Sequence, residues 1–432
     1  MKALVWTIAG LFVVLFIVTT FVPYEPARVE ASDYFFQDEI DTGLDYAFQR
    51  RLFMWSSVAL ELVLLYVLAT TNLVRRWANW VRDRSGIRSI LPMLGVGLIY
   101  MVLAELVHLP LAIGRFYHSH AWGMSNLSFG SWVQDHLLAL AIYALEGTVV
   151  LVGLYTLLTL LPRVWWLIAP LGAGALAVAY AFLAPVLINP LFNDFEPLAE
   201  TQWKDQQSRV QALISKADVP VKEILVMNAS RQSNHTNAYF TGFGSTRRIV
   251  LYDNLLKKHT PDEIESVLAH EIGHWQHDHI VKGILLGMLA AVLGCFVLDR
   301  LLRVAVNRPP WNLKSKADPA GVPLVLLLFF LGSWIAMPVG NVVSRHFERQ
   351  ADQVALDLAR QPVVFSACEQ KMARDNKSNL APTPWNVWLF SSHPPTVERM
   401  RMAEEWDESH PDERQRRKKE EAERVKFIGV IK

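Results

Sequence analysis

Seven stretches of roughly 20 or more mainly apolar residues divide the sequence, and they restrict its possible folds more than any other feature. The hydrocarbon core of a membrane is about 30 Å thick, a distance that roughly 20 helical residues cross. Of the 432 residues, 52% are hydrophobic, which is too many for an ordinary soluble enzyme. The sequence therefore predicts an α-helical polytopic membrane protein with spans at about residues 3–22, 53–74, 90–114, 137–161, 164–192, 280–302 and 322–343.

The first apolar stretch has two interpretations, because Lys2 precedes it much as a basic residue precedes the core of a secretory signal peptide. Its apolar run is longer than such a core, and no small-x-small cleavage site follows it. An uncleaved first span is therefore favoured.

Two polar regions, residues 193–279 and 344–432, are long enough to fold outside the bilayer, and together they should make one domain. The tail is dense in both charge signs, which indicates a solvated helix or a partly disordered segment. The expected layout is spans one to five in 1–192, the polar domain in 193–279 and 344–403, spans six and seven in 280–343, and the charged tail in 404–432.

Charge and cysteine usage exclude several classes of function. The formal net charge of +1 gives no argument for a nucleic-acid partner. Only Cys295 and Cys368 occur, so neither a disulfide framework nor a cysteine-based zinc site is expected. Any metal ion must be held by His, Asp or Glu side chains.

The first polar region combines helical and strand patterns. A helical pattern covers about residues 201–217, and the run "KEILVMNAS" is typical of a strand. In "NAYFTGFGSTRRIVLYDNLL", glycine and serine between two strand-like runs indicate a hairpin. Thr260 as N-cap, Pro261 at the first helical position and the acidic residues after it then mark the start of a helix.

That helix contains "HEIGH", in which His270 and His274 are one helical turn apart and face the same way. Two imidazoles so placed can reach one zinc ion at about 2.0–2.1 Å. Glu271 follows His270 directly and should project toward the open side of the metal, where it can accept a proton from water. A catalytic zinc ion also needs a third protein ligand.

The third ligand is sought in "SRHFERQADQVAL", where Glu348 and Asp352 are one helical turn apart. We expect Glu348 to be the ligand and Asp352 to hydrogen-bond a ligand histidine. Taken without the first motif, the pair reads instead as a solvated helix face with Arg345 and Arg349 as salt-bridge partners. Two further histidines near the first motif, His277 and His279, are weaker candidates, because ligands spread along one helix cover too wide an arc.

Taken in order, "NPLFNDFEPL", "SRQSNHTNAYF", "RRIVLYDNLL", "DEIESVLAHEIGHW", "SRHFERQAD" and "SSHPPTVERM" resemble the integral-membrane zinc metalloproteases of the CAAX prenyl protease type 1 (Ste24-like, M48) family. The resemblance implies seven transmembrane helices enclosing a water-filled chamber, and a mixed α/β zincin-like catalytic domain. It also implies one zinc ion at a mouth of the chamber, with His270, His274 and Glu348 as ligands and Glu271 as base.

The resemblance carries over further residues. Asn237, Ala238 and Tyr239 match the substrate-binding strand of the family, whose free edge can pair with a peptide backbone. His393 matches a histidine placed near the zinc, suited to donating to a tetrahedral oxyanion. Arg399 matches an arginine that organises the site. On its own, His393 would read as a surface histidine before two prolines.

The expected activity is zinc-dependent hydrolysis of peptide bonds in membrane-associated or C-terminally prenylated substrates. The expected partners are a peptide or membrane-protein substrate and the lipid bilayer. A zinc-binding transporter or channel is the competing class, and a catalytically dead scaffold is a third. Glu271 favours the protease, because a transport site has no use for a base beside the metal.

Ionisable residues inside the spans leave two interpretations open. Glu61, Glu105, His108 and Glu146 fall within spans two, three and four, where charges are costly unless they face water or a partner. Either a wet chamber or structural pairing between helices would explain them.

The side of the membrane that holds the polar domain is argued in two directions. Resemblance to proteases acting on cytosolic substrates favours the cytoplasmic side. The positive-inside rule slightly favours the outside, because basic residues collect in the opposite loops. These residues are Arg75, Arg76, Arg82, Arg84 and Arg88 after span two, and Arg303, Arg308, Lys314 and Lys316 after span six.

Overall fold

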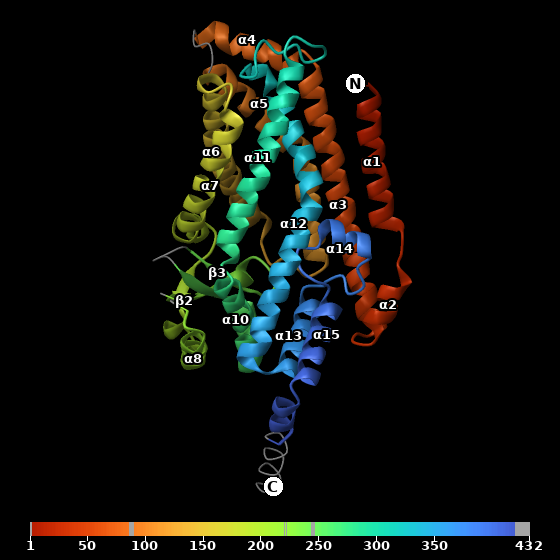
Figure 1. The fold of residues 1–432 in the computed structure, drawn as a ribbon, viewed down its shortest axis with the longest axis vertical. Helices are drawn as coiled ribbons and strands as arrows, with labels where there is room; N and C mark the ends of the chain where they lie inside the picture. The colour runs from red at the N-terminus through yellow and green to blue at the C-terminus, as the bar shows by residue number, and fades with distance from the viewer. Residues whose placement is uncertain (1, 86–89, 220, 222, 243–246, 420–432) are drawn as a thin grey trace. The chain divides into compact units, whose positions relative to one another are not determined.

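The computed structural model of the chain describes residues 2–85, 90–219, 221, 223–242 and 247–419 (Figure 1). Arg88, Lys222, the turn of the expected hairpin at 243–246 and the last part of the charged tail lie outside these residues. The chain forms two compact units. The first consists of Met1–Phe48, Pro185–Ile280 and Val339–Lys432, and the second of Gln49–Ala184 and Val281–Pro338.

Seven helical segments among the described residues are long and apolar enough to cross a membrane, so the expected number of spans is confirmed. They contain α1 (Lys2–Phe21), α3 (Gln37–Thr70), α5 (Ile90–Ala121), α6 (Phe129–Leu160), α7 (Trp165–Leu183), α11 (His279–Ala305) and α12 (Val322–Ala359). Several extend well past the apolar stretches. Helix α12 continues from span seven to the end of the Glu348 and Asp352 motif without a break.

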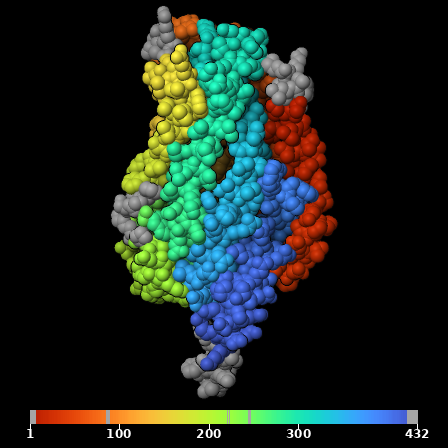
Figure 2. Space-filling model, viewed as in Figure 1, coloured from red at the N-terminus to blue at the C-terminus, as the bar shows by residue number. Residues whose placement is uncertain are grey.

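In the second unit, long helices pack side by side and leave apolar side chains on their outer surfaces. Helix α11, visible as a blue-green band in Figure 2, exposes Leu285, Leu289 and Leu293, which are four residues apart. Such a row on one helix face suits contact with lipid. The short helix α4 (Leu73–Ser85) packs against α5 and crosses it at a steep angle (Figure 1).

Three of the ionisable residues expected inside the spans, Glu61, Glu105 and His108, are paired across helices of the second unit. The Tyr100 hydroxyl donates to Glu61 at 2.7 Å, and His108 Nε2 lies 3.0 Å from the same carboxylate. Glu105 lies 2.8 Å from His136 Nε2. Glu61 and Glu105 each have a partner on another helix, as structural pairing between helices requires.

The first unit contains a four-stranded sheet in the order β1-β2-β4-β3. Strand β2 pairs parallel with β4, while β1 and β3 run antiparallel to their neighbours and form the two edges. The strand pattern in "KEILVM" and the two strands of the expected hairpin are thereby confirmed. The strands are β1 (Phe195–Pro197), β2 (Glu223–Met227), β3 (Ala238–Thr241) and β4 (Arg248–Tyr252).

Helices cover this sheet and bury its apolar side chains. The core contains Ile249 and Leu251 of β4 with Leu268 and Ile272 of α10, none more than 1% exposed. The other helices of the unit are α2 (Glu25–Ser32), α8 (Gln207–Ala217), α9 (Asp253–Lys258), α10 (Pro261–Gln276), α13 (Pro362–Asp375), α14 (Pro384–Phe390) and α15 (Thr396–Ser409). Helix α8 begins six residues later than expected. The expected tail begins inside α15, where Trp406 is buried.

Helix α10 begins as expected, with Thr260 and Glu263 forming a reciprocal capping box and Pro261 in the first turn. It approaches α12 closely at Gly273, where an added Cβ would lie 2.7 Å from the Cα of Ala351. Helix α10 ends at Gln276, and a separate helix, α11, begins at His279. The helical conformation is interrupted between α10 and α11, where Asp278 adopts a positive φ of 51°.

Candidate metal centre

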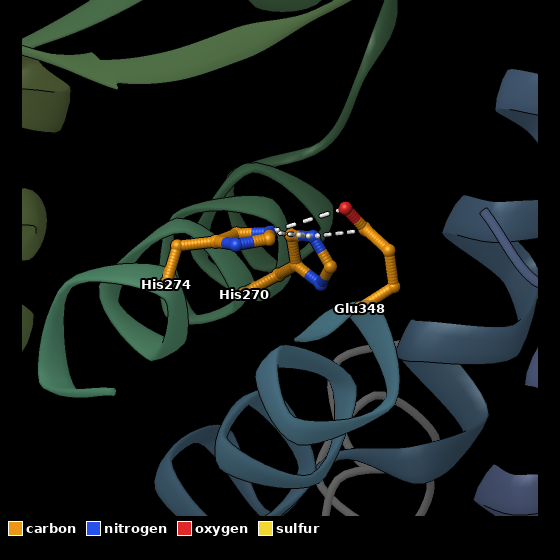
Figure 3. A group of neighbouring side chains, drawn as sticks. All are labelled: His270, His274 and Glu348. Atoms are coloured by element: carbon orange, nitrogen blue, oxygen red, sulfur yellow. Dashed lines mark hydrogen bonds and ion pairs between the residues drawn. The ribbon is translucent and has the colours of Figure 1, made fainter. Parts of the chain in front are cut away.

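Three side chains with metal-binding atoms meet between α10 and α12 (Figure 3). His270 and His274 project from one face of α10, as their four-residue spacing requires, and their Nε2 atoms are 3.2 Å apart. Glu348 reaches them from α12, with carboxylate oxygens 3.4 Å from His270 Nε2 and 3.6 Å from His274 Nε2. One ligand atom from each residue lies within 4.8 Å of the others.

A buried carboxylate holds the far side of the His270 ring. Asp352, which is fully buried, accepts a hydrogen bond from His270 Nδ1 at 2.8 Å. Arg399 donates to the same carboxylate, through Nε at 2.8 Å and Nη2 at 2.5 Å. Asp352 and Arg399 therefore lie behind the His270 ring, where hydrogen-bonding groups commonly orient a metal-binding histidine.

The alternative of a solvated helix face is wrong. Arg345 donates to the backbone carbonyls of Val387 and Ser391, and Arg349 pairs with Glu398. Neither arginine pairs with Glu348 or Asp352, and both of these carboxylates are buried.

Glu369 of α13 belongs to the same network and was missed in the sequence. Its carboxylate accepts a hydrogen bond from Nη1 of Arg399, on the side of the guanidinium away from His270. Burial raises the pKa of Glu369 above its ordinary value, in spite of the adjacent Arg399. No local pattern points to this residue, because it lies on an ordinary amphipathic helix and reaches the site only through tertiary packing.

Glu271 lies next to the three-residue cluster and is not part of it. The backbone N–H of Phe240 in β3 donates to its carboxylate at 3.4 Å. Burial raises the pKa of Glu271, although the two neighbouring histidines act in the opposite direction. A raised pKa brings a carboxylate closer to the range in which it can both accept and return a proton.

Ala238 and Tyr239 lie in the edge strand β3, and Asn237 precedes it directly. The Asn237 carbonyl accepts from the Tyr252 amide of β4. Because successive residues of a strand point their amides in opposite directions, the amides of Ala238 and Phe240 face the free edge. The Ala238 amide is bonded to the side chain of Asn237 at 2.9 Å. The Phe240 amide is the one that reaches Glu271.

His393 lies at the rim of the cluster. Its Nε2 is 3.3 Å from Glu348, and its side chain is 60% exposed. Arg345 holds the preceding segment from α12, donating at 2.7 Å to the carbonyl of Val387 and at 2.6 Å to that of Ser391. The histidine of "SSHPP" is therefore positioned by a buried contact two residues earlier.

The two remaining histidines of the first motif do not join the cluster. His279 Nδ1 lies 2.9 Å from Nδ1 of His274, on the side of the ring away from Glu348. His277 stacks on His279, with ring centroids 5.5 Å apart.

The chemistry of the donor set fits a divalent metal ion. His270 Nδ1 donates to Asp352, so the Nε2 of the neutral ring presents a lone pair toward Glu348 and His274. Such unshared pairs repel unless a cation lies among them. Without a metal ion, burial opposes a charge on His270, but its hydrogen bonds to Asp352 and Glu348 prevail and raise its pKa to about 10, so a bound cation would take the place of the proton on Nε2. Two histidines and a carboxylate form a set typical of catalytic zinc.

Comparison with known families gives a match over most of the chain. The model of peptidase family M48 matches residues 200–407, and that of the CAAX prenyl protease N-terminal region, with five membrane helices, matches residues 24–194. An uncharacterized metalloprotease of Bacillus subtilis, YhfN, is 30% identical over 377 residues, 87% of each chain. The chain belongs to peptidase family M48. It is a metalloprotease and an integral, multi-pass membrane protein, which favours the protease over the transporter interpretation.

Similar proteins also occur in eukaryotes. CAAX prenyl protease 1 of Saccharomyces cerevisiae is 34% identical over 325 residues, 69% of each chain. The human CAAX prenyl protease 1 homolog is 30% identical over 260 residues, 49% of this chain and 52% of that one. The crystal structure of S. mikatae Ste24p has the same fold, with a TM-score of 0.74, 24% identity and coverage of 85% of this chain and 89% of that chain.

Proposed function

We propose that this metalloprotease is a zinc endopeptidase in which His270, His274 and Glu348 hold one Zn²⁺. The convergence of these three side chains from α10 and α12, with Glu271 beside them, supports the proposal. Bound zinc in such a site supplies Lewis-acid activation of water and of a carbonyl group.

Glu271 is the proposed general base. It accepts the proton of the attacking water and returns it to the leaving amine, a role that its burial and raised pKa suit. His393 is exposed at the rim of the cluster and can donate a hydrogen bond to the developing oxyanion. Asp352, Arg399 and Glu369 stay out of the proton transfer and keep His270 in place.

The proposed substrate is an extended peptide that pairs with the free edge of β3. An edge strand offers backbone amides and carbonyls to a second chain, and the amide of Phe240 faces Glu271. Pairing there would bring a peptide beside the base. Because relatives bear the name CAAX prenyl protease, C-terminally prenylated peptides are the first class to test, with other membrane-associated proteins as the alternative.

The deciding experiment combines product analysis with metal analysis on the purified, detergent-solubilised protein. Peptides with and without a C-terminal prenyl group are incubated with metal-free and zinc-restored protein, and the cleavage products are identified by mass spectrometry. We expect hydrolysis only with metal restored. Glu271→Gln should keep about one zinc per chain while hydrolysis falls by at least roughly 10²-fold. Loss of zinc from Glu271→Gln would contradict its role as a base, and full activity without metal would contradict the metal mechanism.

A further inference from the structure

The two histidines of the cluster are held from behind by different chemistry. His270 Nδ1 faces the carboxylate of Asp352, whereas His274 Nδ1 faces a nitrogen, Nδ1 of His279, at 2.9 Å. The other nitrogen of His279, Nε2, lies 3.0 Å from Oε1 of Gln350 on α12. A row of three side chains in contact therefore runs from His274 through His279 to Gln350.

The interruption of the helix between α10 and α11 makes this row of contacts possible. In a continuous α-helix a residue five positions further on points about 140° away from the first, so residue 279 could not reach the ring of His274. The helix ends at Gln276, Asp278 takes a left-handed conformation, and α11 begins at His279. This turn brings the His279 ring back onto His274.

His279 is held firmly in this position. It is 6% exposed, and its ring stacks on Phe347 of α12 with centroids 4.2 Å apart and planes 10° from parallel. Phe347, Glu348 and Gln350 belong to the same stretch of α12. The helix that supplies the third cluster residue therefore also fixes the group behind His274.

The donors and acceptors of His274, His279 and Gln350 allow one arrangement of protons that suits metal binding. Gln350 Oε1 can only accept, so His279 Nε2 carries the proton that it donates there. A neutral His279 then has a lone pair at Nδ1, which accepts the proton of His274 Nδ1. His274 is left with its lone pair at Nε2, the atom that faces His270 and Glu348.

We propose that His279 and Gln350 are positioning residues that set the tautomer of His274, so that its Nε2 is free to bind the metal ion. If His279 Nδ1 donated to His274 Nδ1 instead, the proton of His274 would lie on Nε2 and would block that atom from binding a metal ion. His279 does for the second histidine what Asp352 does for the first, with a neutral acceptor in place of a carboxylate. This inference rests on the metal site of the proposed function, and adds the residues that prepare one of its ligands.

Variants at position 279 separate hydrogen bonding from packing. In His279→Asn the side-chain oxygen is bonded to Cγ, as Nδ1 is in histidine, and can accept from His274. His279→Leu fills similar space and cannot accept. His346→Ala is the matched control, because this histidine is exposed on α12 beside Phe347 and lies outside the cluster.

The measurement is zinc affinity of the full-length protein in detergent, by competition with a chromophoric chelator. The absorption spectrum of the Co²⁺-substituted protein serves as a second readout of ligand geometry. We expect His279→Leu to bind zinc about 10- to 100-fold more weakly, and His279→Asn to recover most of this loss. Gln350→Glu, which also can only accept, should bind zinc like the wild type, whereas Gln350→Lys should resemble His279→Leu.

Wild-type affinity and an unchanged cobalt spectrum in His279→Leu would overturn the proposal. Equal losses in the Asn and Leu variants, with equal thermal stability of their metal-free forms, would also overturn it, because packing alone would then explain the effect. These outcomes differ from a failure of the proposed function. If the wild-type chain itself bound no zinc, the metal site would be wrong, whereas a metal-binding protein insensitive to position 279 would contradict only the positioning role.

Discussion

His270 and Asp352 are 82 residues apart in the chain, and their side chains share a hydrogen bond of 2.8 Å. The bond fixes the ring of His270 so that Nε2 faces Glu348, which lies one helical turn before Asp352 on α12. Two residues on one face of one helix thus take two roles. One carboxylate points into the cluster, and the other supports it from behind.

This division of roles predicts different effects of removing each carboxylate. Glu348→Ala should almost abolish zinc retention, because one of the three proposed ligands is lost. Asp352→Ala should weaken zinc affinity or activity by about 10- to 100-fold, since only the orientation of His270 changes. Metal analysis after dialysis against a chelator series measures both. If Asp352→Ala lost more zinc than Glu348→Ala, the two assignments would have to be exchanged.

Arg345 is expected to act through His393. Arg345→Met removes two hydrogen bonds to the carbonyls of Val387 and Ser391, so the "SSHPP" segment should loosen. Turnover should fall about 10-fold or more while zinc content stays unchanged. The double variant is the control. Because Arg345 is expected to act through His393, Arg345→Met should add little to the loss of turnover already caused by His393→Ala. Fully additive losses would show that Arg345 acts elsewhere.

The free edge of β3 predicts the effect of a proline. Ala238→Pro removes an amide that faces away from β4, so the pairing with β4 should survive. A substrate backbone would lose a donor that it could take over from the Asn237 side chain. Cleavage should be abolished with zinc still bound, as measured by product analysis and metal content. Normal turnover by this variant would show that the peptide docks at another surface.

Asp253 predicts a pH-dependent contribution to stability. Burial opposes its charge, but hydrogen bonds from Lys257 and Ser230 prevail and lower its pKa below the ordinary value. The ionised form therefore stabilises the fold above the unfolded-state pKa of about 4, and this contribution is lost as pH falls through the lower folded-state pKa. Asp253→Asn should lower the free energy of unfolding at pH 7 by about 1–2 kcal/mol, which is measured as a lower thermal midpoint. The difference from wild type should shrink toward pH 3, and a gap that widened on acidification would contradict this assignment.

The distribution of basic residues predicts that the metal centre lies outside the cytoplasm. A cysteine at Ser409, which is exposed, tests this in a chain where Cys295 and Cys368 are replaced by alanine. Intact cells are treated with a membrane-impermeant thiol reagent. Labelling before lysis supports an outward centre. Protection until lysis, with full reaction afterwards, would place the centre in the cytoplasm.

The sequence by itself determined the features that depend on local periodicity. Seven apolar stretches of sufficient length predict seven spans, because each helix must satisfy its own backbone hydrogen bonds in lipid. The capping residues around Thr260 predict the start of α10. A four-residue spacing places His270 and His274 on one face, since the helix repeats every 3.6 residues.

Only the tertiary structure decided how distant segments complete the site. Glu369 joins Arg399 from another helix, and no spacing along the chain records that contact. His279 reaches His274 because the helix is interrupted at Asp278. Local patterns constrain residues within a turn or two of each other. Contacts between helices depend on packing over the whole unit, as at Gly273, where α10 and α12 approach too closely for any side chain.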